Sequence, residues 1–349
     1  MPTTTTALAD LQFGPEYTAY TQERSIELNA FAQSGVAEID ANLNALAAGQ
    51  GGTYDLPFFK DLTKTDPNIS SDDDSVIGAR KKITTGMQAA RLHMYNQIWS
   101  SSDLARALIA ADPMDAIARL TAQYWATWSE KMIIQTALGV LADNIANDSS
   151  DMLVNISTIN DASGGAAARK LQVSTLIDGL QTMGDAKNDI AAIGVHSIVH
   201  ASLQKQGALL EHYDLETNAL NFETLMGKRV IVDDSMPVTV ESINDGGGAA
   251  NKTVYTSILF GSGAIRLGAG APKQAVATVR DEKAGNGGGV EDLIERKHMI
   301  VHPIGFKWLN ASVAAVPGAT SAELATAANW DRVFNRKNIP LAFIKSRLS

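Results

Sequence analysis

The sequence predicts an α+β protein that combines one very long helix with a protruding pair of extended segments. Three observations support this prediction. Apolar residues recur at helical spacing without a break from Asp112 to Asn147. Two extended segments flank a charged loop between Gly51 and Trp99, and strand-like segments dominate from Thr253 onward. The sequence contains no internal repeat.

The N-terminal segment, from Glu16 to about Ala48, has apolar residues at roughly helical spacing, interrupted at Gly35. A second short helical stretch ends at Gly49. The apolar content is low and no partner helix follows closely in the sequence. Two interpretations stay open: an arm that lies on another subunit, or a locally packed helical hairpin.

Two extended segments come next, at residues 51–62 and 80–99. The polar stretch between them contains Asp72, Asp73 and Asp74 and is typical of a mobile loop. These features predict a protruding β-hairpin. In an isolated globule such a hairpin would expose too much unpaired strand edge, so we expect it to pair with another chain.

The long helix has a well-defined predicted start. Asp112 suits the N-cap, Pro113 suits the first helical position, and Asp115 can bond back in the manner of a capping box. At 1.5 Å per residue this helix is roughly 50 Å long, which makes it a spine of the molecule. Two apolar stripes are predicted to be its packing surfaces: Ile117, Leu120, Tyr124, Trp128 and Met132, then Ile134, Leu138, Leu141 and Ile145.

A compact layered α/β region is predicted after a Ser/Gly/Ala-rich break at residues 157–168. Its expected elements are a helix at 176–183, a strand at 190–195, a helix at 197–206 and a strand at 229–233. The β-rich remainder is predicted to contain strands at 254–260, 264–267, 274–281, 291–302, 305–313 and 339–344. A flexible loop at 283–289 and a short helix at 321–328 interrupt these strands.

Composition excludes several classes of protein. Hydrophobic residues make up 45% of the 349 residues, so the chain is not disordered. The formal charge of −9 argues against a tight nucleic-acid binder, which needs clustered Lys and Arg to neutralise phosphates. The absence of cysteine excludes disulfides, thiolate chemistry and zinc sites built on sulfur.

Neither a signal peptide nor a membrane span is predicted. The first nine residues are Thr-rich and lack a basic stretch and an apolar core. No uninterrupted apolar run reaches the ~18 residues that a spanning helix needs. We therefore expect a protein of the cytoplasm, or of a particle assembled there, with no membrane partner.

Two groups of residues resemble known catalytic or binding motifs. Gly261, Gly263 and Gly268 lie between two predicted strands, so a dinucleotide phosphate would lack the helix N-terminus it needs, and we predict a tight hairpin instead. His196 and Ser197 follow a strand, but the Gly-x-Ser-x-Gly frame of a nucleophile elbow is missing. We predict that Ser197 is a helix N-cap and that His196 and His200 are structural, because no Glu lies between them as the zinc motif requires.

The remaining candidates have simpler interpretations. Asp72, Asp73 and Asp74 lack the alternating ligands and the glycine of a calcium loop, so a solvated run is predicted. The glycines at 246–248 and 287–289 are predicted to be flexible loops. No constellation reaches the standard of an active site. We therefore assign no catalytic, cofactor-binding or metal-binding residue, expect no cofactor and predict that the protein is not an enzyme.

Several stretches together carry a family resemblance. They are AQSGV at 32–36, LPFFKDL at 56–62, ITTGMQ at 83–88, residues 97–104, the helix start at 112–113 with Tyr124 and Trp125, and GVHSIVHASLQ at 194–204. The most specific are MGKRVIVDDSMP at 226–237, LFGSG at 259–263, GNGGG at 285–289 and HPIGFKW at 302–308. With these stretches in order over most of its length, the chain resembles the tailed-bacteriophage major capsid (coat) protein family.

The resemblance implies a domain organisation. It implies the tailed-phage major capsid fold, with an N-terminal arm at 1–50, an extended β-hairpin loop at 51–100, a peripheral domain with the spine helix at 101–171 and an axial domain at 172–250. A β-rich return to the peripheral domain and a C-terminal strand occupy 251–349. Some members crosslink subunits through a Lys of the extended loop and an Asn; Lys64, Lys81 and Lys82 are available, but nothing marks the partner Asn or a catalytic acid.

The resemblance also implies a function. The expected role is self-assembly into the icosahedral head shell that encloses the double-stranded DNA genome, through hexamers and pentamers. Expected partners are a separate scaffolding protein, a portal, a decoration protein as a further candidate, and packaged DNA contacted non-specifically. The expected location is the virion capsid, assembled in the cytoplasm of the host bacterium.

Two rival functions remain at this stage. An encapsulin-like compartment would share the fold but enclose protein cargo. An α/β hydrolase that uses Ser197 would belong to a different class. Particle contents would separate the first rival from a phage capsid, and the effect of Ser197→Ala on ester hydrolysis would test the second.

Overall fold

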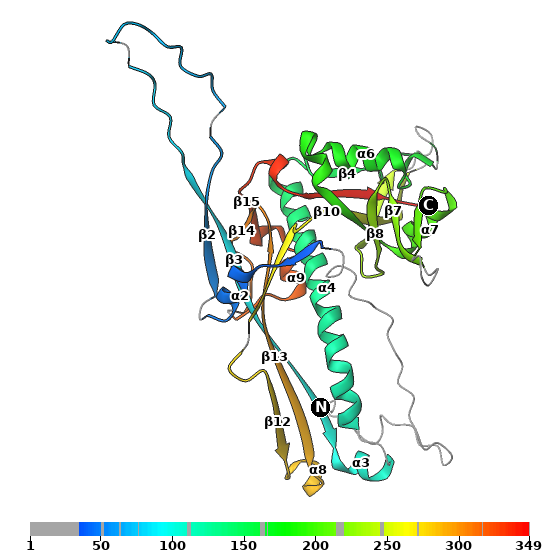
Figure 1. The fold of residues 1–349 in the computed structure, drawn as a ribbon. Coiled ribbons are helices and arrows are strands. Elements are labelled where there is room, and N and C mark those ends of the chain that lie inside the picture. Colours follow the sequence, from blue (N-terminus) through cyan, green and yellow to red (C-terminus); the bar gives the residue numbers. More distant parts are fainter. Residues whose placement is uncertain are drawn as a thin grey trace.

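The computed structural model describes residues 35–348 except for gaps at 50–51, 63, 76, 110–112, 161–164, 166, 214–219, 245–247, 271 and 316. The molecule is elongated (Figure 1). A long hairpin leaves one end, a single long helix runs through the middle, and a second sheet with its own helices lies beside the upper half of that helix. The helical prediction for residues 16–34 lies outside the described residues.

The predicted spine is the helix α4, Pro113–Asn147. Its proposed N-cap, Asp112, lies outside the described residues. The prediction of two stripes is only partly correct, because Leu120 and Tyr124 are more than a third exposed, whereas residues 132–134 are buried on successive positions. The second half of the helix contacts β13, β15, α9 and η3, and this surrounding structure buries more than one face.

A six-stranded sheet carries the hairpin. Its order is β1-β11-β13-β3-β2, with β12 paired to β13. The strands are β1 (Ala37–Ile39), β2 (Thr53–Phe59), β3 (Thr85–Ser102), β11 (Ile265–Gly270), β12 (Val276–Asp281) and β13 (Val290–Pro303). The short helix α3 (Asp103–Ile109) follows β3, and α8 (Ala284–Gly287) lies in the β12–β13 connection.

The helical prediction for the N-terminal segment is wrong at residues 37–39. These residues form β1, which pairs in parallel with β11. The helix α2 (Ala41–Ala47) follows, with Asp40 as its N-cap. The backbone of α2 lies directly on β11, because a Cβ at Gly268 or Gly270 would come within 2.7 or 2.1 Å of α2 carbonyl oxygens. Long-range strand pairing therefore overrides the local helical pattern.

The predicted hairpin is confirmed. β2 and β3 pair antiparallel from Thr53 opposite Arg91 to Phe59 opposite Thr85. The connecting residues 60–84 contain no helix or strand among those described, and they project away from the body (Figure 1). The second segment begins later than predicted, at Thr85, and also ends later, because β3 continues to Ser102 as a partner of β13.

An eight-stranded sheet forms the second layered unit, in the order β4-β16-β10-β5-β8-β7-β6 with β9 paired to β10. Its strands are β4 (Leu153–Asn155), β5 (Ile190–Val195), β6 (Leu210–Tyr213), β7 (Leu220–Leu225), β8 (Lys228–Val232), β9 (Val238–Asn244), β10 (Ala249–Gly261) and β16 (Leu341–Ser346). The helices α6 (Val173–Gln181) and α7 (Ser197–Lys205) pack on it around a core that includes Leu176, Ile193, Leu203 and Leu259. The 3-10 turn η2 (Gly184–Asp189) leads into β5.

The prediction of a tight hairpin at Gly261–Gly268 is wrong. β10 and β11 belong to different sheets and do not pair. The intervening turn carries the chain from one sheet to the other, with Gly263 at a φ of +61° and its N–H donating to the Gly35 carbonyl oxygen at 3.1 Å. A glycine turn between two strands has the same local sequence whether the strands pair as a hairpin or belong to different sheets.

The C-terminal region closes the core that both sheets share. It contains β14 (Phe306–Trp308), α9 (Ser321–Leu324), η3 (Ala327–Asn329), β15 (Trp330–Arg332) and η4 (Arg336–Asn338). The strand predicted at 305–313 stops at Trp308, shortly before Asn310 at a φ of +59°. The last strand lies two residues later than predicted, since η4 and Pro340 precede it. Within the described residues, no helix combines the length and apolarity of a membrane span.

Candidate subunit-contact surfaces

The hairpin loop, residues 60–84, carries large apolar side chains that its own chain leaves in solvent. Ile69 is 94% exposed and Ile77 83% exposed, and Phe59 and Leu62, at and just after the end of β2, are 71% and 67% exposed. Ile83 and Met87 are also more than half exposed. Burial of one such side chain stabilises an assembly by about 1.5–3 kcal/mol. A patch of this kind on a projecting loop is typical of a protein–protein contact.

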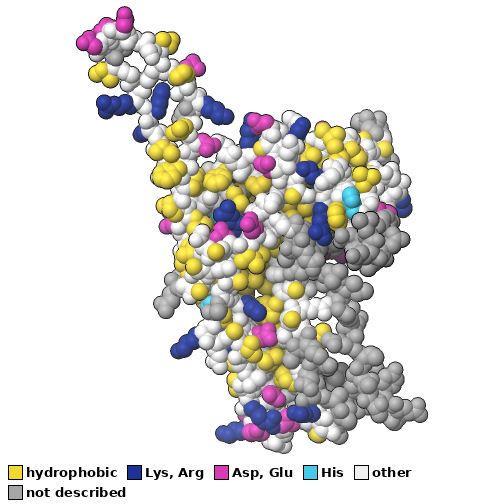
Figure 2. Space-filling view, in the orientation of Figure 1, with side chains coloured by type: hydrophobic (Ala, Val, Ile, Leu, Met, Phe, Trp, Pro, Cys, Tyr) yellow, Lys and Arg dark blue, Asp and Glu magenta, His cyan; other side chains and the backbone are white. Residues whose placement is uncertain are grey.

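Charge is unevenly distributed along the same hairpin loop. The acidic residues 72–74 lie at its tip, and basic side chains lie nearer the body (Figure 2). Hydrogen bonds from the side chain and the backbone N–H of Ser75 lower the pKa of Asp73, so its carboxylate stays ionised. The basic side chains are Lys60, Lys64, Arg80, Lys81 and Lys82.

The root of the hairpin is fixed to the body. The ring of Phe58 meets the ring of Phe334 edge-on, with centroids 4.7 Å apart. Gln88 Oε1 accepts hydrogen bonds from His302 Nε2 at 3.0 Å and from the Gly305 N–H at 3.1 Å. The hairpin therefore leaves the body in a defined direction.

Two buried histidines lie on the strands below this root. Burial, together with the positive charge of Arg91, lowers the pKa of His93 to about 3. Burial and Arg266 lower the pKa of His302 to about 4. His93 Nδ1 accepts a hydrogen bond from the Ala319 N–H at 3.1 Å, so its neutral form holds the loop that precedes α9.

An aromatic groove of about 370 Å³ lies between β3 and the first half of α4. We define this aromatic groove by Met94, Tyr95, Asn96, Gln97, Tyr124, Trp125, Trp128 and the loop residues 315 and 317–321. Trp125 Nε1 donates to Glu295 Oε2 at 2.6 Å, and the Tyr95 hydroxyl donates to the Ala319 carbonyl oxygen at 2.6 Å. These bonds fix two of the rings, whereas Trp128 Nε1 has no acceptor among the described residues.

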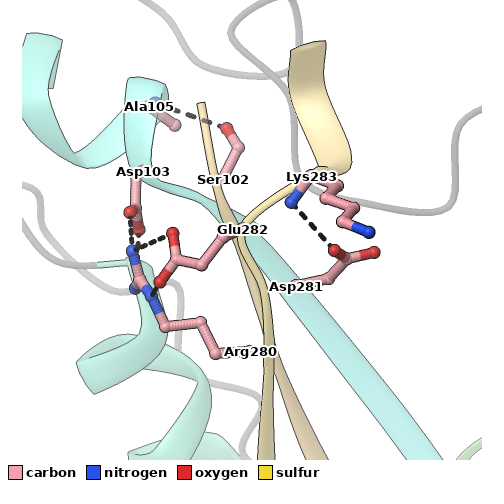
Figure 3. Close-up of polar contacts among 7 residues, drawn as sticks. All are labelled: Ser102, Asp103, Ala105, Arg280, Asp281, Glu282 and Lys283. Carbon is pink, nitrogen blue, oxygen red and sulfur yellow. Dashed lines mark hydrogen bonds and ion pairs between the residues drawn. The ribbon is translucent and has the colours of Figure 1, made fainter. Parts of the chain in front are cut away.

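The end of the molecule opposite the hairpin is held by an ion-pair cluster (Figure 3). Arg280 of β12 bonds to both carboxylate oxygens of Asp103, at the start of α3, and its Nε donates to Glu282 Oε1 at 2.5 Å. Hydrogen bonds from Arg280 lower the pKa of Asp103. Gly289 lies against this cluster at a φ of +82°, and a Cβ there would come within 2.8 Å of Asp103 Oδ2, so a side chain would strain the backbone and displace the ion pairs.

The residues considered for hydrolysis are close together but are not arranged as a catalytic triad. His196, and not Ser197 as predicted, is the N-cap of α7, because its Nδ1 accepts the Ile198 N–H at 3.2 Å. Ser197 Oγ lies 3.5 Å from the same nitrogen and also bonds to Asp234, whose pKa this bond lowers. A general base needs a free nitrogen aimed at the nucleophile, and this nitrogen is already engaged.

The other sequence candidates make local contacts in the structure. His200 Nε2 is hydrogen-bonded to Glu223 Oε2 and does not share a ligand site with His196. Asp73 bonds to Ser71 and Ser75 in an exposed turn. Within the described parts of the chain, no group of three or more His, Asp or Glu side chains is placed to hold a metal ion.

Sequence reasoning missed the aromatic groove and the exposed isoleucines. Both had a signal. Tyr124, Trp125 and Trp128 are too many large rings for one stripe of a helix that has no partner helix. Ile69 and Ile77 are large apolar residues in an otherwise polar loop that also carries Leu62 and Ile83, a pattern that favours a contact with another molecule.

Comparison with known proteins shows which family the chain belongs to. The Gp13-like family, described as "Major capsid protein 13-like", matches residues 99–339. The major capsid protein of Bacillus phage SPP1 is 38% identical over 346 residues, which cover 98% of each chain. The chain belongs to this major capsid protein family. Its members are capsid proteins, so the chain is a phage capsid subunit that forms a shell, and the comparisons favour this function over a cellular compartment.

Solved structures show the same fold in other phages. The capsid of Ralstonia phage GP4 matches with a TM-score of 0.60 and 9% identity, over 99% of this chain and 98% of that one. The capsid of cyanophage Pam1 matches with a TM-score of 0.56 and 11% identity, over 100% of this chain and 99% of that one. The predicted tailed-phage capsid fold is therefore confirmed for this capsid subunit.

Proposed function

We propose that this capsid subunit assembles with copies of itself, as hexamers and pentamers, into the icosahedral head shell that encloses the phage double-stranded DNA. One observation carries the proposal. The hairpin projects from the body with its most exposed large apolar side chains, Ile69 and Ile77, almost fully in solvent. A monomer gains nothing from this arrangement, whereas a shell of identical subunits buries the same residues in every copy.

The proposed domain organisation is the one that the family resemblance implies. The arm is residues 1–50 and the extended loop is residues 51–100. Residues 101–171, with α4, form the peripheral domain, and residues 172–250 form the axial domain around the capsomer centre. Residues 251–349 return to the peripheral domain through β11–β13, which support the hairpin, and end in β16 of the axial sheet.

The proposed mechanism is cooperative assembly through many modest contacts. Rings form through the axial domains, and the arm and the hairpin connect each subunit to several others. Each contact on its own is weak, but simultaneous contacts raise the effective concentration and make dissociation rare. Rotation and bending of packed units such as the two sheets would then allow a change of shell shape.

The proposed partners and setting are those of a phage head. They are a scaffolding protein, a portal, a decoration protein as a further candidate, and DNA contacted without sequence preference, with assembly in the host cytoplasm. A net charge of −9 supports a shell that binds the packaged DNA only weakly. We also propose that the subunit has no enzymatic activity, and Ser197→Ala with ester substrates tests this point.

The hairpin provides the test of the assembly role. Deletion of residues 53–82 would also remove β2, whose Tyr54 and Leu56 pack against a buried cluster formed by α2, β3 and β13. Replacement of residues 62–82 by a short Gly-Ser linker keeps β2 and β3. The expected product is a folded, soluble subunit that forms no stable shells with its scaffolding partner. Normal shells from this variant would overturn the hairpin's assigned role, and shells filled with protein cargo instead of DNA would favour the compartment.

A further inference from the structure

Four carboxylates lie where the C-terminal end of α4 meets β15. We call this group the acidic junction, and its members are Asp143, Asp148, Asp151 and Asp331. Arg332 of β15 bonds to Asp148 Oδ1 at 3.1 Å and to the two carboxylate oxygens of Asp151 at 2.8 and 2.9 Å. Asp331 pairs with Lys307 at 2.7 Å. Three of the carboxylates therefore each have a cationic partner.

Asp143 is the fourth carboxylate, and it points towards β15 from inside the protein. It lies one helical turn after Gly139, on the face of α4 where a Cβ would meet Trp330 of β15. The residue is 0% exposed. Its Oδ1 accepts a hydrogen bond from Asn147 Nδ2 at 2.6 Å, whereas its Oδ2 is buried and has no hydrogen-bond partner among the described residues. A buried carboxylate oxygen of this kind is costly unless a proton or a cation compensates it.

Asp148 offers a second oxygen of the same kind. Its Oδ2 is also buried without a partner in the described part of the chain, because Arg332 takes Oδ1. Burial, and after it the charges of Asp148 and Asp331, raise the pKa of Asp143. Burial also raises the pKa of Asp148, and the opposing effect of Arg332 does not cancel this rise. The acidic junction therefore holds more negative charge than its own cations compensate.

We propose that the acidic junction binds a hard divalent cation, Mg²⁺ or Ca²⁺, through Asp143 Oδ2 and Asp148 Oδ2. Both cations prefer oxygen ligands, and Mg²⁺ in particular binds through one or two carboxylates and keeps several waters. Within the described residues no three acidic or histidine side chains converge on one ion, so water or backbone carbonyl oxygens complete the coordination. The side chain of Asp148 is 18% exposed, which gives an ion access from solvent. The negative end of the α4 dipole favours a cation at this place.

A cation at the acidic junction fastens the end of α4 to both neighbouring elements. Asn144, next to Asp143, accepts a hydrogen bond at its Oδ1 from the Met152 N–H at 3.1 Å. The Met152 carbonyl oxygen in turn accepts from the Phe343 N–H of β16 at 2.9 Å. The helix end is thus linked to β15 on one side and to the eight-stranded sheet on the other. Binding of the ion should slow hydrogen exchange at residues 144–155.

Terbium luminescence tests this site on the full-length soluble subunit and does not require shell assembly. Tb³⁺ occupies the oxygen sites of hard cations and emits when a nearby tryptophan is excited, and Trp330 directly precedes Asp331. We expect subunit stripped with a chelator to give sensitised emission that millimolar Mg²⁺ or Ca²⁺ displaces. Asp143→Asn and Asp148→Asn should each weaken Tb³⁺ binding about ten-fold or more. Asp73→Asn, which removes an exposed carboxylate of the hairpin loop, is the matched control and should bind Tb³⁺ as the wild type does.

Thermal unfolding provides the second measurement. Mg²⁺ or Ca²⁺ should raise the unfolding midpoint of the wild type and of Asp73→Asn, but not that of Asp143→Asn or Asp148→Asn. Equal Tb³⁺ affinity in the wild type and Asp148→Asn, with no cation-dependent rise of the midpoint, overturns the site. A more stable Asp143→Asn together with a wild type that ignores both cations also overturns it, because a proton then neutralises Asp143. If Asp143→Asn does not fold, the partly exposed Asp148→Asn carries the same comparison.

Discussion

The ring of Phe58 occupies the space that Gly86 leaves by having no side chain. Gly86 lies opposite Phe58 in the hairpin, and a Cβ at Gly86 would fall 2.4 Å from the ring. The same ring meets Phe334 edge-on at 4.7 Å. Together with the hydrogen bonds of Gln88, this glycine–aromatic pair and its contact with the segment between β15 and η4 fix the direction of the hairpin.

Gly86→Ala is expected to displace the Phe58 ring and loosen the root of the hairpin. The physical reason is overpacking, which in a tight site costs about 1–3 kcal/mol. Hydrogen exchange at residues 85–91 should become faster, and the yield of shells should fall. Gly52→Ala is the matched control, because its Cβ would meet nothing within 4 Å. Equal exchange in both variants would contradict this role of the glycine.

The close packing of α4 at Gly139 leads to a second prediction. A Cβ at Gly139 of α4 would lie 2.1 Å from the Leu324 carbonyl oxygen and 2.3 Å from Trp330 Nε1, and that indole donates to the same oxygen at 2.7 Å. Gly139→Ala should therefore lower the free energy of unfolding by about 2 kcal/mol or more, despite the better helix propensity of alanine. Chemical denaturation checks this, with the exposed Ala146→Ser on the same helix as a control that changes stability little.

The buried histidines predict loss of stability in acid. The unfolded chain binds protons at His93 and His302 near pH 6.5, whereas the folded chain binds them only near pH 3 and pH 4. Between these values the unfolded state holds more protons, so stability is full above about pH 6.5 and falls as the pH drops. The slope is at most about 1.4 kcal/mol per pH unit for each histidine.

Denaturation of the subunit between pH 7 and pH 4 measures this dependence. His93→Gln should flatten the profile, although it also disturbs the bond to the Ala319 N–H. The informative quantity is therefore the change of stability with pH, not the stability at one pH. An unchanged slope in the variant would show that other groups cause the acid sensitivity.

At the end of the molecule opposite the hairpin, two variants separate the contribution of the ion pairs from that of the backbone conformation. Gly289 has a φ of +82°, and a Cβ there would meet Asp103, Arg280 and Glu282. Gly289→Ala should destabilise the β12–β13 connection more than Arg280→Ala, since exposed ion pairs contribute little. Raising the salt concentration should reduce the effect of Arg280→Ala and leave that of Gly289→Ala. The reverse order of effects would show that the ion pairs hold this end.

The elements that could be predicted from sequence are those with a local cause. α4 was predictable because apolar residues keep helical spacing from Pro113 to Asn147. The hairpin was predictable because a polar, charged loop separates two extended segments. β1 was not predictable, since residues 37–39 are extended only because they pair with β11. The glycine turn after Gly261 was misjudged for the same reason, because only the distant partners decide whether two strands share a sheet.

The candidate contact surfaces divide in the same way. The exposed apolar residues of the hairpin loop have a signal within the loop itself. The aromatic groove has only a partial signal in the sequence, the rings of Tyr124, Trp125 and Trp128, because β3, α4 and the loop at 315–321 meet only after the chain has folded. The N-cap role of His196 was also hidden, since Ser197 beside it has the more common capping side chain.

The most direct test of shell assembly through the hairpin loop is negative-stain electron microscopy. The subunit is co-expressed with candidate scaffolding proteins and fractionated by size before it is viewed. We expect closed hollow shells from the wild-type chain and only small soluble particles when a Gly-Ser linker replaces residues 62–82. Small monodisperse particles from the wild-type chain with every scaffold, or shells that form equally well without the hairpin loop, would contradict this expectation.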